Sequence, residues 1–122
     1  MPHHFLYDYG MKLYGIPTCD SVRKARSILD QRGTRYQYID LRQNPPDDAV
    51  LRDWLSRFGT ALINKRSTTY REHKAAVLAA EAASDDALVA LLREHPTLIK
   101  RPVITRGDDV WLGLDAPPLQ SP

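Results

Sequence analysis

The stretch that decides the fold lies near the start of the chain, where residues 11–41 read MKLYGIPTCDSVRKARSILDQRGTRYQYIDL. The apolar run Leu13–Ile16 predicts a short buried strand. Asp20–Gln31 predicts a helix, because its apolar residues recur at helical spacing: Val22, Ala25, Ile28 and Leu29. Tyr36–Leu41 is rich in aromatic and β-branched residues and predicts a second strand. A strand, a helix and a strand in about thirty residues form a βαβ unit, whose strands pair in parallel.

The sequence after residue 41 predicts a helical insert at about 45–96, followed by a two-stranded hairpin. Apolar residues at helical spacing predict the helices of the insert, which we place at about 50–58, 73–83 and 85–95. A loop over Ala61–Tyr70 separates the first two and carries the basic run at Lys65 and Arg66. Two apolar segments joined by the turn Arg106–Asp109 predict the hairpin and complete an α/β fold.

The composition is that of one small globular domain. Its 122 residues are 43% hydrophobic and 26% charged, which is ordinary for such a protein. The net charge of +2 is too weak to predict a nucleic-acid or membrane partner. No stretch is long and apolar enough to span a bilayer. We expect residues 11–114 to form the domain, residues 1–10 to be a disordered N-terminal extension, and residues 115–122 to be an irregular tail.

Cys19 is the single cysteine, which excludes an internal disulfide and points to the reducing cytoplasm. It stands where the predicted strand gives way to the helix. Unpaired backbone N–H groups and the positive end of the helix dipole therefore face its sulfur. Both favour the thiolate, which is the nucleophilic form. The alternative is a small residue that only packs at a strand-to-helix turn. Neither His73 nor His95 stands at metal-ligand spacing, so we expect no metal site.

Two arginines are candidates for stabilising a thiolate and binding an anionic substrate beside it. Arg101 directly precedes Pro102 in an otherwise apolar segment, and Arg66 lies in the predicted loop of the insert. A nearby guanidinium lowers the pKa of a thiol and binds anions with a planar fork of donors. The residue before a proline is held in extended geometry, and a cis bond can form there. The alternative for each arginine is a solvated surface charge.

Three segments in this order resemble the arsenate reductase/Spx family, and most closely its YffB-type branch: Gly15–Ala25, Arg66–Tyr70 and Ile99–Pro102. The resemblance implies a thioredoxin-like mixed four-stranded sheet, with a helical insert between its βαβ and ββ parts. It further implies that Cys19 is the nucleophile and that Arg101 belongs to the family's Arg-Pro motif. Pro102 is then the proline that the family holds cis beside the thiol.

The chain departs from arsenate reductases at two positions. Their middle-loop arginine stands where this chain has Asn64, and their last-strand arginine falls near Gly113. Two of the three arginines expected to bind an oxyanion have therefore moved or gone, which disfavours arsenate as the substrate. Spx-type regulators often carry Cys-x-x-Cys near the start, and Val22 removes that switch here.

The resemblance and the single thiol together predict a monothiol reductase. Cys19 attacks an oxidised sulfur or arsenic centre, and an external thiol resolves the intermediate. We expect glutathione as co-substrate and no bound cofactor, with glutaredoxin as a further partner. Thr18, Arg66 and Pro102 are the predicted contacts of substrate or glutathione. Two alternatives stay open: an Spx-like adaptor that binds the RNA polymerase α subunit without catalysis, and a weak arsenate reductase dependent on glutathione and glutaredoxin.

Overall fold

The structure, a computed structural model, describes residues 10–121, so almost all of the predicted N-terminal extension at 1–10 lies outside the described residues. The chain divides into two compact units. One combines the residues up to 40 with those from 101 onward, and the other is Leu41–Lys100. The insert predicted at about 45–96 lies within the second unit. Among the described residues, no helix is both long and apolar enough to cross a membrane.

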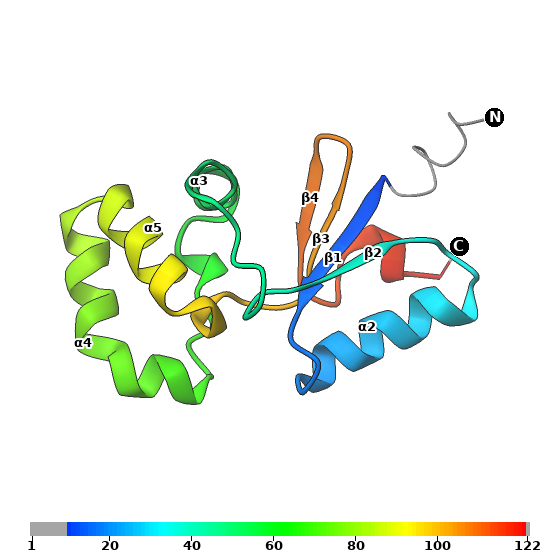
Figure 1. Ribbon diagram of the computed structural model, residues 1–122, viewed down its shortest axis with the longest axis horizontal. Helices are drawn as coiled ribbons and strands as arrows, with labels where there is room; N and C mark the ends of the chain where they lie inside the picture. The colour runs from blue at the N-terminus through cyan, green and yellow to red at the C-terminus, as the bar shows by residue number, and fades with distance from the viewer. Residues whose placement is uncertain (1–9, 122) are drawn as a thin grey trace. The chain divides into compact units, whose positions relative to one another are not determined.

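The first unit is built on a mixed four-stranded sheet in the order β2-β1-β3-β4 (Figure 1). The strands are β1 (Met11–Gly15), β2 (Gln37–Asp40), β3 (Val103–Arg106) and β4 (Asp109–Leu112). β1 pairs in parallel with β2 across the α2 crossover, as the βαβ pattern predicts, and antiparallel with β3. The β3–β4 pair is the predicted hairpin. One of the two central strands, β1, therefore belongs to the segment that begins the domain, and the other, β3, follows the helical insert.

Helix α2 (Asp20–Gln31) covers one face of this sheet and has the predicted bounds. Its buried residues follow helical spacing: Val22, Ala25 and Leu29. They pack on a row of side chains that the strand register places across the sheet: Tyr38, Leu13, Ile104 and Trp111. The helix ends at Gln31 with Arg32 as its C-cap, and the following Gly33 has a φ of +69°, the left-handed conformation that favours glycine after a helix.

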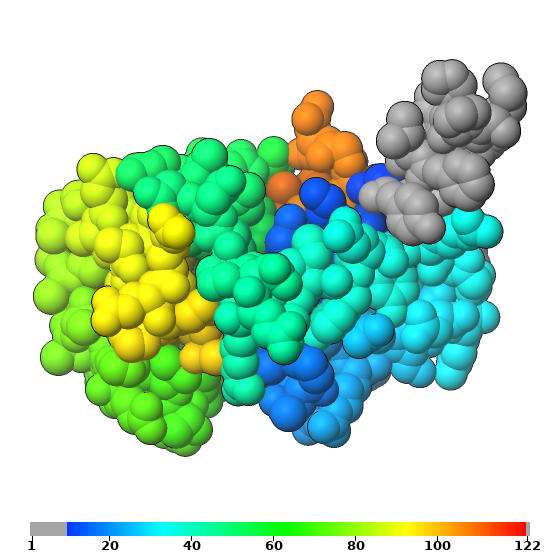
Figure 2. Space-filling view, viewed as in Figure 1, coloured from blue at the N-terminus to red at the C-terminus, as the bar shows by residue number. Residues whose placement is uncertain are grey.

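The second unit is helical. It contains α3 (Asp48–Phe58), α4 (Thr68–Ala83) and α5 (Asp85–Glu94), together with the short 3-10 helices η1 (Gly59–Leu62) and η2 (Pro96–Leu98). In the space-filling view α5, in yellow, lies beside α4, in yellow-green (Figure 2). Each α-helix begins with a side chain that accepts from a first-turn backbone N–H, which is the usual N-cap arrangement: Asp47, Ser67 and Ser84.

Helix α4 begins earlier than the sequence predicts. Residues 68–70, predicted to be part of a loop, form its first turn, and the Ser67 hydroxyl caps it by accepting from the Tyr70 N–H at 3.0 Å. The helix is also kinked at His73, where φ is −117° and ψ is 18°. Burial of Tyr70, which is 8% exposed, supplies the tertiary contact that recruits this segment into the helix.

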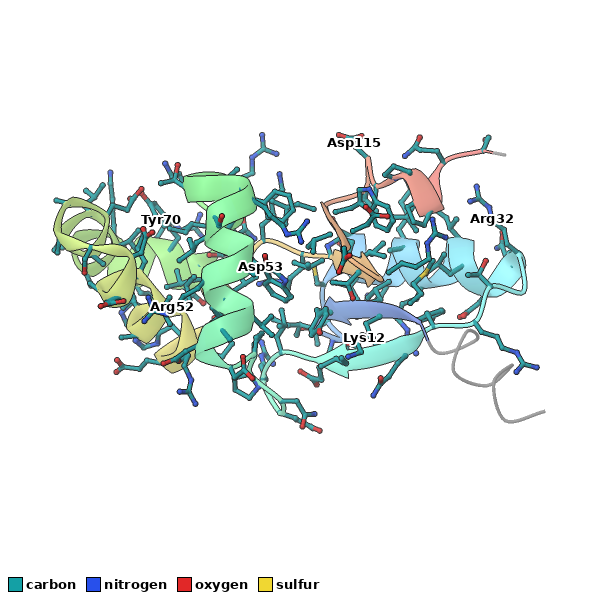
Figure 3. The ribbon with its side chains drawn as sticks, turned by 90° about the horizontal axis from the view of Figure 1, so that it is seen from above. Lys12, Arg32, Arg52, Asp53, Tyr70 and Asp115 are labelled. Atoms are coloured by element: carbon teal, nitrogen blue, oxygen red, sulfur yellow. The ribbon has the colours of Figure 1, made fainter. Side chains whose placement is uncertain are left out.

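The predicted irregular tail contains one regular element. Residues Pro117–Leu119 form the 3-10 turn η3, and the Leu119 side chain is only 4% exposed. Arg32, at the end of α2, donates from its guanidinium to the carbonyl oxygens of Pro118 and Leu119, at 2.9 and 3.3 Å (Figure 3). Leu119 and Ala116 join the same apolar cluster as α2. The tail is therefore part of the packed unit.

Candidate active site

Cys19 is the N-cap residue of α2. Its backbone is extended, with φ −84° and ψ 124°, and its side chain is partly exposed. The Cys19 N–H donates to the Ile16 carbonyl at 3.1 Å, and its own carbonyl accepts from the Arg23 N–H at 3.0 Å. These bonds fix the turn from β1 into the helix, and they leave the sulfur at the start of α2, as the sequence predicts.

Strand pairing brings Arg101 to the same place. In the antiparallel β1–β3 pair, Tyr14 near the end of β1 lies opposite Val103 at the start of β3. Arg101 and Pro102 directly precede Val103, so they reach the end of the sheet at which β1 turns into α2. The Arg101 side chain lies close enough to the Cys19 sulfur for its guanidinium donors and charge to lower the pKa of the thiol. The structure therefore joins two predicted site residues that lie far apart in the sequence.

Pro102 is buried, and the Arg101–Pro102 peptide bond is cis. The Pro102 carbonyl accepts from the Gly113 N–H at 2.8 Å, which ties this turn to the end of β4. Gly113 has a φ of +86°, a left-handed conformation that disfavours any side chain. This position, near which the resemblance places the last-strand arginine of arsenate reductases, is therefore suited to glycine in this backbone.

The pKa of Cys19 is lower than that of an ordinary thiol, although its largest single influence acts the other way. Burial raises the pKa, because it disfavours the charged thiolate. The Val22 backbone N–H, the Arg101 guanidinium and the Ser21 backbone N–H outweigh burial, because each stabilises the negative sulfur. The helix start and Arg101 thus both lower the pKa of the thiol.

The structure provides less support for two other predicted contacts, Thr18 and Arg66. Thr18 is exposed, and its hydroxyl makes no hydrogen bond to Cys19 or to any other residue that the structure describes. Arg66 is exposed and belongs to the helical unit, where its backbone N–H donates to the Asn64 side-chain oxygen at 3.1 Å. The roles of both side chains toward substrate or glutathione remain predictions.

Tyr38 is a neighbour of the thiol that the sequence did not single out. It lies opposite Leu13 in the β1–β2 pair, with the Arg26 guanidinium 3.9 Å from the centre of its ring. Its pKa is raised mainly by burial of the hydroxyl, and the charges of Asp40 and the Cys19 thiolate raise it further, against Arg26. The spacing of Tyr36, directly before β2, and Tyr38, within it, was a signal that both rings face α2.

The described residues contain no group of three or more histidine, cysteine, aspartate or glutamate side chains that could hold a metal ion. The chemistry that the arrangement supports is nucleophilic. A partly exposed sulfur, biased toward the thiolate and paired with a guanidinium, can attack an electrophilic centre and can hold an anionic group beside it.

Comparison with known proteins places this site in a family. The ArsC family matches residues 14–118. An uncharacterised protein of Haemophilus influenzae is 34% identical over 104 residues, covering 84% of this chain and 90% of the relative. A solved structure of a protein called YffB is 31% identical, with a TM-score of 0.73 over 84% of this chain and 90% of the other. A structure described as arsenate reductase from Vibrio cholerae is 28% identical, with a TM-score of 0.72 over 88% and 91%.

The mixed four-stranded sheet with its helices is thus the thioredoxin-like fold of these structures, as the sequence predicts. The matched residues include Cys19, Arg101 and Pro102, and they span more than half of the chain. The chain therefore belongs to the ArsC family.

Proposed function

We propose that the protein is a monothiol reductase, in which Cys19 attacks an oxidised sulfur centre and glutathione resolves the covalent intermediate. The contact between Cys19 and Arg101 at the start of α2 carries this proposal, because it stabilises the thiolate at a partly exposed position. Membership of the ArsC family, and relatives described as arsenate reductases, support an oxidoreductase that works through a thiol.

The reaction takes place in thiol–disulfide exchange steps. The Cys19 thiolate attacks one sulfur of a disulfide, so that a new S–S bond forms while the old one breaks, and the leaving thiolate takes the electron pair. Because the chain has one cysteine, no internal thiol can release the product. A glutathione thiolate attacks the mixed disulfide, and a second glutathione then restores Cys19. The net result is two substrate thiols and one glutathione disulfide, with two glutathiones oxidised.

Basic and polar side chains supply the proposed contacts with glutathione. Its two carboxylates suit the guanidinium groups of Arg101 and Arg66, which can each donate two parallel hydrogen bonds. Its peptide backbone suits the turn at Pro102, and the exposed Thr18 hydroxyl adjoins Cys19 in the chain. Arg101, Pro102 and Thr18 belong to the unit that contains Cys19, and these contacts would direct the glutathione sulfur to the Cys19 disulfide.

Arsenate reduction is the second candidate, and the relatives described as arsenate reductases favour it. The side chains of this chain favour it less. Asn64 stands where arsenate reductases carry an arginine, and Gly113 contributes no cation. Arg66 would then have to replace the missing charge. Turnover of arsenate with glutathione and glutaredoxin, compared in the parent protein and in Arg66→Gln, distinguishes this candidate from reduction of a disulfide.

The test of the proposal combines reactivity and turnover. Alkylation of Cys19 followed by mass spectrometry as a function of pH should give a midpoint below about 8.5, the value of a free cysteine. Glutathione-dependent reduction of a small mixed disulfide, coupled to glutathione reductase, should proceed with the parent protein and stop in Cys19→Ser. A midpoint at or above the free value, or no turnover above the Cys19→Ser background, would contradict the proposal. Binding to the RNA polymerase α subunit would then be measured instead.

A further inference from the structure

The helical unit contains an open hollow of about 510 Å³ between η1, the loop before α4 and the end of the unit. Its lining includes three cations and no acidic residue: Lys65, Arg66 and Lys100. We call it the basic hollow. All three side chains are exposed, while the buried Ile63, at 4% exposure, contributes an apolar part of the wall. The volume falls within the range of about 300–1,000 Å³ that is typical of small-molecule sites.

Backbone pairing holds together the two chain segments that carry the three cations. Ile63 and Ile99 form an antiparallel bridge, which the Asn64 N–H extends by donating to the Leu98 carbonyl at 2.7 Å. On the other side, the Lys100 N–H donates to the Leu62 carbonyl, also at 2.7 Å. Lys100 is thereby fixed across from the segment that continues into Lys65 and Arg66.

The loop that carries Lys65 and Arg66 is fixed by its own hydrogen bonds. The Asn64 side-chain oxygen accepts from the Arg66 N–H at 3.1 Å, and the Asn64 carbonyl accepts from the Ser67 hydroxyl at 2.9 Å. The same Ser67 hydroxyl caps α4. Asn64 therefore organises the backbone of the loop, and the positive charge there is carried by its neighbours.

A second hollow in the same unit contains cations whose charge is neutralised by neighbouring carboxylates, and we call it the compensated hollow. It measures about 450 Å³, and both arginines and acidic residues line it, the arginines being Arg52 and Arg93. Arg93 pairs with Asp48 at 3.0 Å, and Arg52 pairs with Asp86. By contrast, no ion pair joins Lys65, Arg66 or Lys100 to any residue within 10–121. The basic hollow gathers three positive charges that the protein itself does not neutralise.

We propose that the basic hollow binds a small anion whose charge lies on oxygen atoms, either an inorganic oxyanion such as phosphate or the glutathione carboxylate assigned above to Arg66. The Arg66 guanidinium can hold two oxygens with its planar fork, and the two ammonium groups add charge from either side. Bound anion relieves the repulsion among the three cations. The glutathione form of this inference rests on the proposed function, whereas the oxyanion form does not.

The test follows backbone amide signals of the full-length ¹⁵N-labelled protein at constant ionic strength. Phosphate and glutathione are titrated separately. One of them should shift the amides of residues 60–66 and Lys100 saturably, with a dissociation constant at or below about 1 mM. Lys65→Gln/Lys100→Gln should weaken binding at least about tenfold, because each charge-assisted contact is strong. Arg52→Gln/Arg93→Gln, in the compensated hollow, is the matched control and should leave the affinity unchanged.

Each outcome decides something. Saturable shifts with phosphate alone identify an oxyanion site, and shifts with glutathione alone identify a site for the co-substrate's carboxylate. Shifts with both, in competition, identify the shared chemistry. Cys19→Ser should keep the binding, since Cys19 is not among the lining residues, so loss of the proposed reaction does not affect this result. No saturable shift with either probe, or equal affinity in the double lysine variant, would overturn the inference.

Discussion

Opposing effects on one sulfur atom determine the pKa of the Cys19 thiol. Burial favours the neutral thiol, and it is the largest single influence on the pKa. The N–H groups of Val22 and Ser21 and the guanidinium of Arg101 together favour the thiolate more strongly. The helix start alone supplies only part of this, so the lowered pKa also depends on a residue far away in the sequence.

Arg101→Gln should raise the pKa of Cys19. The substitution removes a positive charge and a hydrogen-bond donor that favour the thiolate, while burial still favours the thiol. The alkylation midpoint therefore moves to higher pH, and at any pH below the new midpoint the variant reacts more slowly than the parent. Mass-spectrometric alkylation rates across the pH range measure this. Arg101→Lys keeps the charge and should give an intermediate midpoint.

Arg23→Gln is the control for that prediction. Arg23, unlike Arg101, is close to Cys19 in the sequence, but its side chain donates to the Pro17 carbonyl at 3.1 Å and pairs with Asp20 at 3.5 Å. It is not among the groups that shift the thiol. Its replacement should leave the midpoint in place, and an equal shift in both variants would assign the effect to net charge instead of to the Arg101 contact.

Tyr36, directly before β2, and Tyr38, within it, should respond differently to loss of the hydroxyl. The Tyr36 hydroxyl accepts from Arg26 at 3.2 Å and donates to Asp30 at 2.9 Å. The buried Tyr38 hydroxyl has no hydrogen-bond partner among the described residues. Tyr36→Phe should lower the free energy of unfolding by about 1 kcal/mol, whereas Tyr38→Phe should change it by less than about 0.5 kcal/mol or raise it. Urea denaturation measures both, and the opposite order would contradict the assignment.

At the scale of elements, the sequence predicted best where local pattern and packing agree. Helix α2 has the predicted bounds because its apolar spacing, its cap position and Gly33 all favour the same helix. The start of α4 was missed because Thr68 and Thr69 are β-branched and read as loop residues. There the Ser67 cap and the burial of Tyr70 decide the structure, and burial depends on contacts that no local pattern contains.

The candidate site shows the same division. The position of Cys19 at a helix start, and the choice of Arg101 as a candidate, follow from local rules about helix starts and Arg-Pro segments. The contact between them needs the antiparallel β1–β3 pairing, which joins distant segments. Tyr38 was missed because its neighbourhood depends on the parallel register with Leu13. Local chemistry could be predicted, while the partners required the register of the sheet.

The approach of α2 to β1 depends on Gly15. A Cβ atom there would lie 2.6 Å from both γ-carbons of Val22, whose side chain is fully buried. Gly15→Ala should therefore force the helix from the strand and lower the free energy of unfolding by about 1–3 kcal/mol. Adding Val22→Ala should recover part of that loss, so that the double variant is more stable than the sum of the single effects implies. Additive losses in thermal unfolding would contradict this close contact.

At the scale of the whole chain, residues of the C-terminal tail complete the apolar core of the first unit. The apolar cluster beneath α2 combines Met11 and Leu13 from its first strand with Ala116 and Leu119 from the tail. Arg32 reinforces this closure through its two bonds to tail carbonyls. The interruption of this unit by Leu41–Lys100 means that its core forms only when both ends of the sequence meet.

Leu119→Ala tests whether the tail contributes to folding. Leu119 is 4% exposed and packs in the same cluster as the helix that presents Cys19, so its truncation leaves a cavity there. The free energy of unfolding should fall by about 2–5 kcal/mol in urea denaturation. Leu78→Ala is the matched control, because Leu78 is 50% exposed, and it should cost less than about 0.5 kcal/mol. Equal, small effects of the two substitutions would mean that the tail only covers a unit that is already stable, and the core would then have to be complete without it.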